Sequence, residues 1–444
     1  MKRLVLAVDC GSTNLKAGLF DAGLERLAEI SAPVVYTCQG PERYEFSPET
    51  FWHSACGAML ELGDLAGITD LALSSQAQTF LFTDPGGKPL TPLVSWLDRT
   101  AAAAAAEARK QLGADFHPHC SFPEPIPQLQ LCKARQWRDR DPALANARLV
   151  TLPGWLALHL GAENGTDENL AAMGGLYSLS RRDWWAEALA FAGLRADQLP
   201  RLVRLGEAIP ARPAIPGFPP DLRVTFAGND QTAGAYGNGV GEGTVLATLG
   251  TALVAYRCVG NRPGACRPGV FRGPYPGNRH YELATRDEGC LALDRMRQER
   301  FSGLAVREFD QLALTYQPTL ESVLFHPERQ ALPATDHQTE LAYATLEGIG
   351  FALRELLEEN LGLARGRETV KLAGGGGKSP VWRQLIASIL ACPTSRAEGD
   401  ALLGAAALAL GIEPSAGSGQ GRCEPDPAQV ELLERRYRRW RQHD

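Results

Sequence analysis

The sequence predicts an α/β protein built from two related lobes, and three observations support this prediction. The chain has 444 residues, which is too many for one ordinary hydrophobic core. An apolar strand, a turn and a second apolar strand occupy residues 3–20, and a weaker copy of this pattern follows at residues 244–258. Helical and strand patterns are both found between the two copies, which is typical of α/β domains.

The first hairpin places a carboxylate at the end of a buried strand. Arg3 to Val8 is the predicted strand, Gly11-Ser12-Thr13-Asn14 the turn, and Leu15 to Phe20 the returning strand. Asp9 follows the first strand, and Lys16 follows the turn. Glycine lets a ligand approach the backbone, turn amides and hydroxyls can receive phosphate oxygens, and a carboxylate suits hydrated Mg²⁺. The pattern indicates phosphate binding, and an ordinary hairpin with a capping aspartate is the alternative.

A second carboxylate lies where another strand gives way to a helix. Leu222 to Phe226 is an apolar strand, Gly228-Asn229 ends it, and Asp230 stands where a helix is predicted to begin. Proteins of the α/β class place catalytic side chains at such junctions. An acid in this position could accept the proton of a substrate hydroxyl during phosphoryl transfer, and simple capping of the helix is the alternative.

A glycine-rich segment, Gly374 to Gly377, precedes Lys378-Ser379 and a helix predicted over Val381 to Leu390. The Gly-Lys-Ser sequence suggests a P-loop, but that motif needs a glycine where Leu372 stands. The P-loop interpretation is therefore excluded. What remains is a surface flattened by glycine, suited to the close approach of a flat ring such as adenine.

Composition narrows the class of partner. The net charge is −6 at a sequence pI of about 5.9, whereas a general nucleic-acid binder needs a basic surface. The longest apolar stretch, Ala401 to Ile412, is shorter than the roughly 18 residues of a membrane span. Ten cysteines include no CxxC pair, which favours reduced thiols. We expect a cytoplasmic protein with a small-molecule substrate and no nucleic-acid or membrane partner; a homodimer is left open.

The end of the chain predicts a docked helix. Glu413 to Pro427 is a polar linker, and Val430 to Gln442 is a helix with five arginines. Leu432, Leu433, Tyr437 and Trp440 form an apolar stripe at helical spacing. We therefore expect the helix to pack on the body of the protein with its basic face in solvent; a nucleic-acid-binding tail is the alternative.

Taken together, these segments resemble the FGGY carbohydrate kinases over nearly the whole chain. The segments that match the family's motifs, in its order, are Asp9 to Lys16, Ile68 to Arg99, Thr166-Asp167 with Ala171, Trp184 before Leu199-Pro200, Gly228 to Gly234, Leu249-Gly250-Thr251, Leu346-Glu347-Gly348 and Gly374 to Gln384. The resemblance implies two ribonuclease-H-like lobes of the actin and hexokinase type around a central cleft for ATP and sugar. It implies an N-terminal lobe at residues 1–237, a C-terminal lobe at 238–415, and a linker with a terminal helix at 416–444.

The resemblance also assigns roles to matching positions. Asp230 becomes the general base, and Asp9 helps to hold Mg²⁺. The positions matched to ATP binding are Gly11, Ser12, Thr13, Lys16, Gly250, Thr251, Gly375, Gly376 and Ser379. The candidates for the acceptor pocket are Gln76, Gln78, Trp96, Asp98, Asp230 and Gln231. Positioning and charge neutralisation suffice for phosphoryl transfer, so this set is chemically complete.

The acceptor pocket departs from two known patterns. Ala77-Gln78 replaces the Arg-Glu of glycerol kinases and the Met-His of xylulokinases. Amides and one carboxylate suit neutral hydroxyls and offer no cation for an acid. We therefore expect a ketopentose, ketohexose or alditol of about five to seven carbons, because a shorter ligand would leave buried polar groups unpaired. A non-kinase actin-fold ATPase or a sugar-sensing binding protein is the alternative function.

Overall fold

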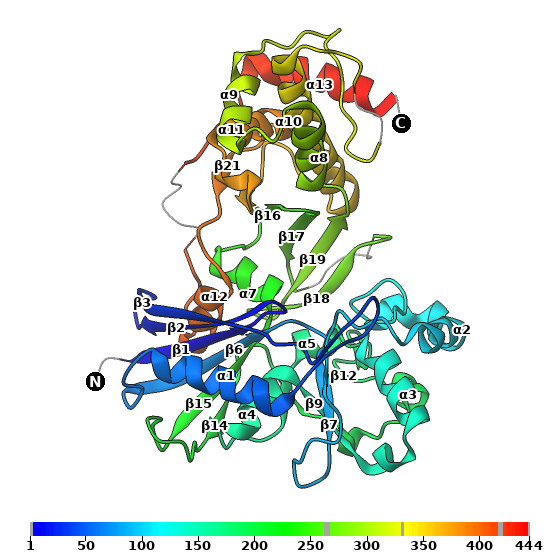
Figure 1. The fold of residues 1–444 in the computed structure, drawn as a ribbon, viewed down its shortest axis with the longest axis vertical. Helices are drawn as coiled ribbons and strands as arrows, with labels where there is room; N and C mark the ends of the chain where they lie inside the picture. The colour runs from blue at the N-terminus through cyan, green and yellow to red at the C-terminus, as the bar shows by residue number, and fades with distance from the viewer. Residues whose placement is uncertain (1–2, 262–266, 330–332, 416–420, 443–444) are drawn as a thin grey trace. The chain divides into compact units, whose positions relative to one another are not determined.

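The computed structural model describes residues 3–261, 267–329, 333–415 and 421–442, which form two compact units (Figure 1). Unit 1 comprises Met1–Gly239, Phe271–Tyr281 and Gly399–Pro414, and unit 2 comprises Val240–Val270, Glu282–Glu398 and Ser415–Asp444. Each unit is therefore assembled from segments that are far apart in the sequence.

In the described residues, unit 1 contains a six-stranded sheet, a five-stranded sheet, two two-stranded sheets and most of the helices of the N-terminal half. Its strands are β1 Leu4–Cys10, β2 Asn14–Asp21, β3 Arg26–Pro33, β4 Cys38–Gln39, β5 Tyr44–Phe46, β6 Ile68–Ser75, β7 Phe80–Thr83, β8 Leu93–Val94, β9 Arg148–Thr151, β10 Gly165–Asp167, β11 Tyr177–Ser178, β12 Asp183–Trp184, β13 Arg201–Val203, β14 Ala208–Ala211, β15 Leu222–Asn229 and β18 Phe271–Tyr275. Its helices are α1 Pro48–Glu61, α2 Ala102–His119, α3 Gln130–Arg140, α4 Leu152–His159, α5 Glu168–Ala172, α6 Ala186–Ala192, α7 Asp230–Gly237 and α12 Ala401–Leu410.

The main sheet of unit 1 has the strand order β14-β15-β6-β1-β2-β3. Its three central strands, β15, β6 and β1, run parallel, and their nearly continuous apolar sequences are buried on both faces. Helices α7 and α12 lie on one face, and α1 and α4 lie on the other (Figure 1). The parallel strands therefore end together at one edge of a fully covered sheet.

The predicted first hairpin is confirmed. β1 and β2 pair antiparallel, with Asp9 opposite Lys16, while Asp9 also stands beside Ser74 of the parallel strand β6. The strand before Asp230 is also confirmed and continues to Asn229, the N-cap residue of α7. The Asn229 side chain accepts the backbone N–H of Thr232 at 2.8 Å, which fixes where the helix begins.

Helix α12 returns late in the chain to pack against α7. A Cβ atom on Gly404 would lie 1.8 Å from the carbonyl oxygen of Ala233, and one on Gly237 would lie 2.3 Å from the carbonyl oxygen of Asp400. Only glycine permits such close backbone contact. The two helices lie side by side (Figure 1), so α7 is held in place by a segment some 170 residues further along the chain.

Unit 2 is a second sheet covered by helices. Its elements are β16 Thr244–Leu249, β17 Leu253–Val259, most of β19 Arg279–Arg286, α8 Cys290–Arg300, α9 Val306–Thr315, α10 Gln338–Glu355, β20 Thr369–Ala373, α11 Pro380–Leu390, β21 Thr394–Arg396 and α13 Pro427–Gln442. The strands follow the order β19-β17-β16-β20-β21, and β16 and β17 form the predicted second hairpin. The internal echo in the sequence therefore corresponds to a hairpin in each unit.

Pro210 lies in the edge strand β14, where it is paired with Arg223 of β15 and its missing N–H is tolerated. The linker predicted over Glu413 to Pro427 includes residues 416–420, which lie outside the described residues. Among the helices in the described ranges, none combines the length and hydropathy that crossing a membrane requires.

The C-terminal helix α13 packs on unit 2, but its basic residues are not all in solvent. Leu433, Tyr437 and Trp440 are buried as the apolar stripe predicted. Arg436, expected on a solvated face, is instead completely buried and forms two 2.6 Å hydrogen bonds to the equally buried Glu347 of α10. The prediction was wrong for this residue because a buried, bidentate carboxylate partner can satisfy a guanidinium.

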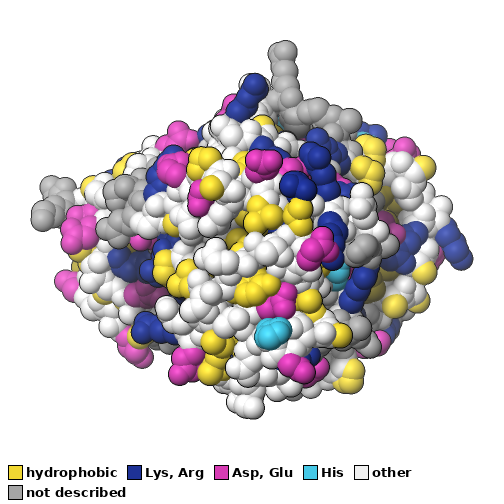
Figure 2. Space-filling view, turned by 90° about the horizontal axis from the view of Figure 1, so that it is seen from above, with side chains coloured by type: hydrophobic (Ala, Val, Ile, Leu, Met, Phe, Trp, Pro, Cys, Tyr) yellow, Lys and Arg dark blue, Asp and Glu magenta, His cyan; other side chains and the backbone are white. Residues whose placement is uncertain are grey.

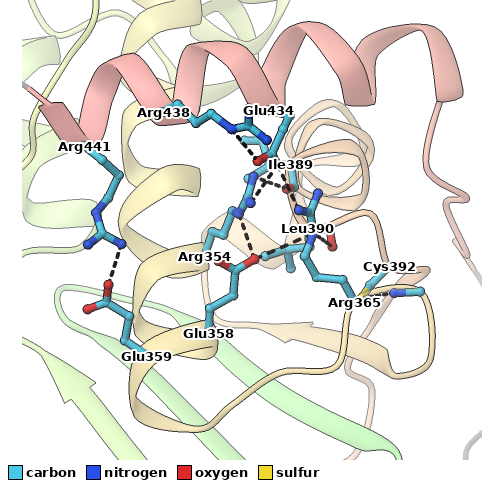
Figure 3. Close-up of polar contacts among 11 residues, drawn as sticks. Arg354, Glu358, Glu359, Arg365, Ile389, Leu390, Cys392, Glu434, Arg438 and Arg441 are labelled. Atoms are coloured by element: carbon cyan, nitrogen blue, oxygen red, sulfur yellow. Dashed lines mark hydrogen bonds and ion pairs between the residues drawn. The ribbon is translucent and has the colours of Figure 1, made fainter.

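A second group of ion pairs surrounds this contact. Arg354 of α10 donates to Glu358 at 2.9 Å and lies 2.8 Å from Glu434 of α13, which Arg365 also contacts (Figure 3). On the face shown in Figure 2, positive and negative side chains are likewise interspersed with hydrophobic ones. Of the α13 arginines, Arg436 and Arg441 therefore pair with glutamates of other segments, while Arg438 contacts Glu434 of its own helix.

We predict that Arg436→Met destabilises unit 2. Removing one member of a buried pair leaves the other charge uncompensated, at a cost of about 3–5 kcal/mol. Arg435→Met, an exposed change on the same helix, should shift stability by less than about 0.5 kcal/mol. Urea unfolding measures both, and the double variant Glu347→Met/Arg436→Met should recover part of the loss. Equal effects of the two single substitutions would contradict the assignment.

Candidate active site

Two carboxylates lie at the shared edge of the parallel strands in unit 1. Asp9 ends β1, and its Oδ1 accepts a 2.8 Å hydrogen bond from the hydroxyl of Ser74 on β6. Asp230 begins α7 directly after β15, and its Oδ1 accepts the backbone N–H of Gln231 at 2.9 Å. Both carboxylates are half-buried. The sheet thus brings together the two acids that the sequence singled out.

Both carboxylates hold their protons more tightly than a free carboxyl group does. Burial is the main cause that raises the pKa of Asp230 to about 7, and the negative charge of Asp9 raises it further. Burial also raises the pKa of Asp9, against the hydrogen bond from Ser74 and the charge of Lys16. A carboxyl whose pKa lies near neutrality is suited to accept a proton at physiological pH.

Asn169 fixes the backbone before Asp230, and sequence reasoning did not identify this role. Its Oδ1 accepts the backbone N–H of Asn229 at 2.9 Å and the Asn229 side-chain amide at 2.8 Å. Its Nδ2 donates to Thr232 at 2.9 Å. Asp167, which caps α5, also accepts the N–H of Gly228 at 3.2 Å. The available signal was the Thr166-Asp167 stretch, whose structural purpose becomes visible only in three dimensions.

The predicted acceptor residues divide into two groups. Gln76 and Asp98 are buried, and their polar atoms are engaged within the protein. Gln76 Nε2 donates to the carbonyl of Gly11 at 3.0 Å, and the Asp98 carboxylate accepts the N–H groups of Tyr44 and Thr100. These two side chains therefore join loops of unit 1 to one another.

The second group of acceptor candidates is Gln78, which is buried with 5% of its surface exposed, and the more exposed Gln231 and Trp96. The Gln78 side chain donates to the carbonyl of Met173 at 3.2 Å, and its Oε1 accepts no hydrogen bond from the part of the chain that the structure describes. Gln231 is exposed, and 37% of Trp96 is exposed. Trp96 therefore offers a partly exposed apolar ring, and the two glutamines offer amide groups.

The first phosphate turn is tight and accessible. A Cβ on Gly11 would lie 2.7 Å from the carbonyl oxygen of Asn14, so this position requires glycine. The carbonyl of Ser12 accepts the hydroxyl of Tyr36 at 3.0 Å, while Thr13 and Lys16 are exposed. The turn therefore leaves a hydroxyl and an ammonium group free to meet an anion.

In unit 2, the glycine-rich segment lies flush against the end of β16. Gly374 has φ +78°, and a Cβ there would lie 2.5 Å from the carbonyl of Leu249; a Cβ on Gly376 would meet Trp382 at 2.5 Å. Gly375 differs, because a Cβ there would have no neighbour within 4 Å. Gly250 and Thr251 follow Leu249 directly. The second hairpin turn and the predicted adenosine segment are therefore adjacent within one unit.

Ser379 and Lys378 close the glycine-rich segment. Ser379 caps α11 by accepting the N–H of Trp382 at 3.1 Å, so its hydroxyl already has one structural partner. Lys378 ends a short 3₁₀ turn over Gly376–Lys378 and is exposed. The segment is therefore a glycine-rich turn before a helix, and the side chain of Lys378 at its end remains exposed.

Two family models match the chain. Residues 4–237 match the N-terminal domain and residues 311–411 the C-terminal domain of the FGGY family of carbohydrate kinases, together more than half of the chain. The chain belongs to the FGGY family of carbohydrate kinases. The resemblance identified in the motifs is thereby confirmed, and family membership makes the protein a carbohydrate kinase.

Individual relatives agree with this family assignment. The chain is similar to the xylulose kinase of Streptomyces rubiginosus, at 27% identity over 92% of this chain and 88% of the relative. It is also similar to the gluconokinase of Bacillus subtilis, at 24% identity over 88% and 83%. The solved xylulose kinase of Rhodospirillum rubrum matches 99% of this chain and 98% of its own with a TM-score of 0.86 at 20% identity. This match confirms the predicted α/β fold of the actin and hexokinase type.

We predict that Asp230→Asn stabilises the protein above neutral pH. The folded chain keeps the Asp230 proton up to about pH 7, whereas the unfolded chain releases it near 3.8. Wild-type stability is therefore lost as pH rises between these values, and a neutral amide removes that loss. A pKa difference of one corresponds to about 1.4 kcal/mol.

Thermal denaturation at about pH 5 and about pH 8 measures this effect. The gain from Asp230→Asn should be larger at the higher pH. The control is Asp115→Asn, an exposed change on α2 that should shift neither value. An equal gain at both pH values would show that the buried charge of Asp230 is not its cause.

We predict that Gly375→Val weakens nucleotide binding and leaves unit 2 folded. The space around Gly375 is open, so valine fits there but occupies the surface on which adenine would lie. Titration calorimetry with ADP should show roughly tenfold weaker binding, about 1.4 kcal/mol. Gly374→Val should instead lower the melting temperature, because Leu249 lies too close. Unchanged ADP affinity in Gly375→Val would remove this residue from the nucleotide site.

Proposed function

We propose that this carbohydrate kinase transfers the terminal phosphoryl group of ATP to a hydroxyl of a small neutral ketose or alditol, with Asp230 as general base. The observation that supports this most is the pair of carboxylates at the edge of the unit 1 sheet. Asp230 lies at the beginning of a helix that is fixed from both sides, by Asn169 and by α12. Its raised pKa suits it to accept the hydroxyl proton as the oxygen attacks phosphorus.

Asp9 fits a role beside a divalent cation. Its Oδ1 accepts the Ser74 hydroxyl, and burial raises its pKa, with the negative charge of Asp400 adding to the rise. Such an environment favours a cation, and Mg²⁺ prefers one or two carboxylates with water as its remaining ligands. When bound, Mg²⁺ supplies charge neutralisation for the phosphates. Asp9 would hold this ion, with Lys16 exposed on the next strand as a further positive charge.

Each unit offers one glycine-containing turn for phosphate oxygens, and unit 2 also offers the glycine-rich segment for adenine. Gly11, Ser12, Thr13 and Lys16 belong to unit 1, and Gly250, Thr251, Gly375, Gly376 and Ser379 belong to unit 2. Backbone amides and hydroxyls of the turns would receive phosphate oxygens. The open surface at Gly375 would receive adenine, because Gly374 and Gly376 on either side have no side chains and let the backbone pack closely against Leu249 and Trp382.

The acceptor is assigned to one buried amide side chain, Gln78, and to two more exposed side chains, Gln231 and Trp96. Gln78 and Gln231 offer amides, and Trp96 offers an apolar wall. Amide groups match hydroxyls and do not neutralise a carboxylate. Gln76 and Asp98 would shape the pocket from behind, since their polar atoms are engaged within the protein. This chemistry favours a neutral ligand over a sugar acid.

We predict that Asp230→Asn lowers kcat by about 10²- to 10⁴-fold, the usual contribution of a positioned base. The reason is that an amide cannot accept the hydroxyl proton. A coupled assay of ADP release measures the rate, and circular dichroism confirms the fold. Asp115→Asn serves again as the control. Turnover like that of the wild type in Asp230→Asn would exclude this residue as the base.

We predict that neutral acceptors are preferred in a panel of D-xylulose, D-ribulose, D-fructose, xylitol, glycerol and gluconate. Glycerol should have a lower kcat/KM because it leaves pocket amides unpaired, a loss that can reach 10⁴-fold in such sites. Gluconate should be poor because its carboxylate meets no cation. If gluconate or glycerol proves best, the acceptor assignment is wrong although the kinase assignment stands. Acceptor-independent ATP hydrolysis alone would instead favour a non-kinase ATPase.

A further inference from the structure

Lys133 is a buried cation whose position opposes two ordinary preferences. It lies in the first turn of α3, where the helix dipole disfavours positive charge, and its side chain is completely buried. A buried ammonium group is costly unless polar groups surround it. A residue that breaks two local rules is most often found where function requires it.

The ammonium group of Lys133 connects two backbone segments. Its Nζ donates to the carbonyl of Gln78 at 2.9 Å and to the carbonyl of Ser95 at 2.8 Å. It also lies 5.6 Å from the centre of the Phe80 ring. Gln78 and Trp96, the residue after Ser95, are both assigned to the proposed acceptor pocket. A single cation therefore holds the backbone beneath both.

The backbone at Gln78 needs such support. Gln78 has φ +64°, a left-handed conformation that is uncommon for a residue other than glycine. Residues held in this region cost roughly 1–3 kcal/mol, and surrounding contacts must maintain them. The hydrogen bond from Lys133 to the Gln78 carbonyl is one such contact, and the bond from Gln78 to Met173 is another.

We propose that Lys133 is a positioning residue that sets the separation of Gln78 and Trp96 and thereby determines which acceptors fit. This inference rests on the proposed function, since it concerns the same pocket. Because both hydrogen bonds end on backbone carbonyls, the ammonium group is used within the protein and is not offered to a substrate carboxylate. Lys133 therefore supports the shape of the pocket and does not bind the acid group of a ligand.

The electrostatic environment is consistent with this use. Burial lowers the pKa of Lys133 to about 7, and the charges of Asp98 and Cys132 oppose that change. Asp98 is itself held by the N–H groups of Tyr44 and Thr100. The lysine and the aspartate therefore belong to one polar core beneath the acceptor segments.

The test compares two lysine variants with a control on the same helix. Lys133→Met removes both donors, and Lys133→Gln keeps an N–H₂ group in case the methionine variant fails to fold. Arg138→Met is the matched control, because Arg138 also donates from α3 to two backbone carbonyls, those of Leu144 and Ala145. Hydrogen–deuterium exchange is measured over residues 76–79 and 95–97, and KM is measured for ATP and for the best acceptor of the panel.

Both lysine variants should speed exchange at residues 76–79 and 95–97. They should also raise the acceptor KM by about 10- to 100-fold, with the ATP KM changed less than about twofold, because misplacement of substrate contacts has costs of this size. Arg138→Met should do neither. Unchanged exchange in the folded lysine variants, or equal rises in the two KM values, would overturn the proposal. If the wild type phosphorylates no acceptor, the proposed function fails, while the exchange result still decides whether Lys133 holds the two segments.

Discussion

Three parallel strands, β1, β6 and β15, end at one edge of the unit 1 sheet, and the chemistry of that unit depends on this shared edge. Asp9, Ser74 and Asp230 come from segments as far apart as residues 9 and 230, yet strand pairing places them next to one another. A side chain at the end of a buried strand has little freedom, because the backbone beneath it is fixed on both sides. The sheet therefore supplies the accurate positioning that phosphoryl transfer requires.

The same arrangement has an energetic cost. Burial opposes the ionisation of both carboxylates and raises the pKa of both, and the negative charge of Asp9 raises that of Asp230 further. The protein maintains the pair by fixing the surrounding backbone. Asn169 and Asp167 hold the strand end before Asp230, and α12 holds α7 through contacts that only glycine allows. The buried carboxylates thus lower the stability of the folded state, and the hydrogen bonds of Asn169 and Asp167 and the contacts of α12 offset this loss. Enzymes commonly accept such a loss of stability at an active site.

Much of this organisation is predictable from the sequence, for physical reasons. Hairpins with glycine turns and the strand before Asp230 are local features, and β1, β2, β15 and β16 form where the pattern places them. Long-range partners are different. The sequence around Arg436 does not indicate that this residue pairs with the buried Glu347. The sequence around Lys133 likewise does not indicate that its ammonium group binds the carbonyls of Gln78 and Ser95. Charge predicts exposure only when a buried partner is absent, and that partner is a property of the fold.

Because long-range partners cannot be predicted from the sequence, substrate specificity is also difficult to predict from the residue types of the proposed acceptor pocket. Residue types suggest a pocket of amides with one carboxylate, but the structure uses Gln76 and Asp98 to join loops within unit 1. Substituting a polar residue in such a segment therefore changes pocket shape as well as pocket chemistry. Under the proposed function, specificity depends on how these loops are held, and internal hydrogen bonds such as those of Lys133 become as informative as the side chains that face the ligand.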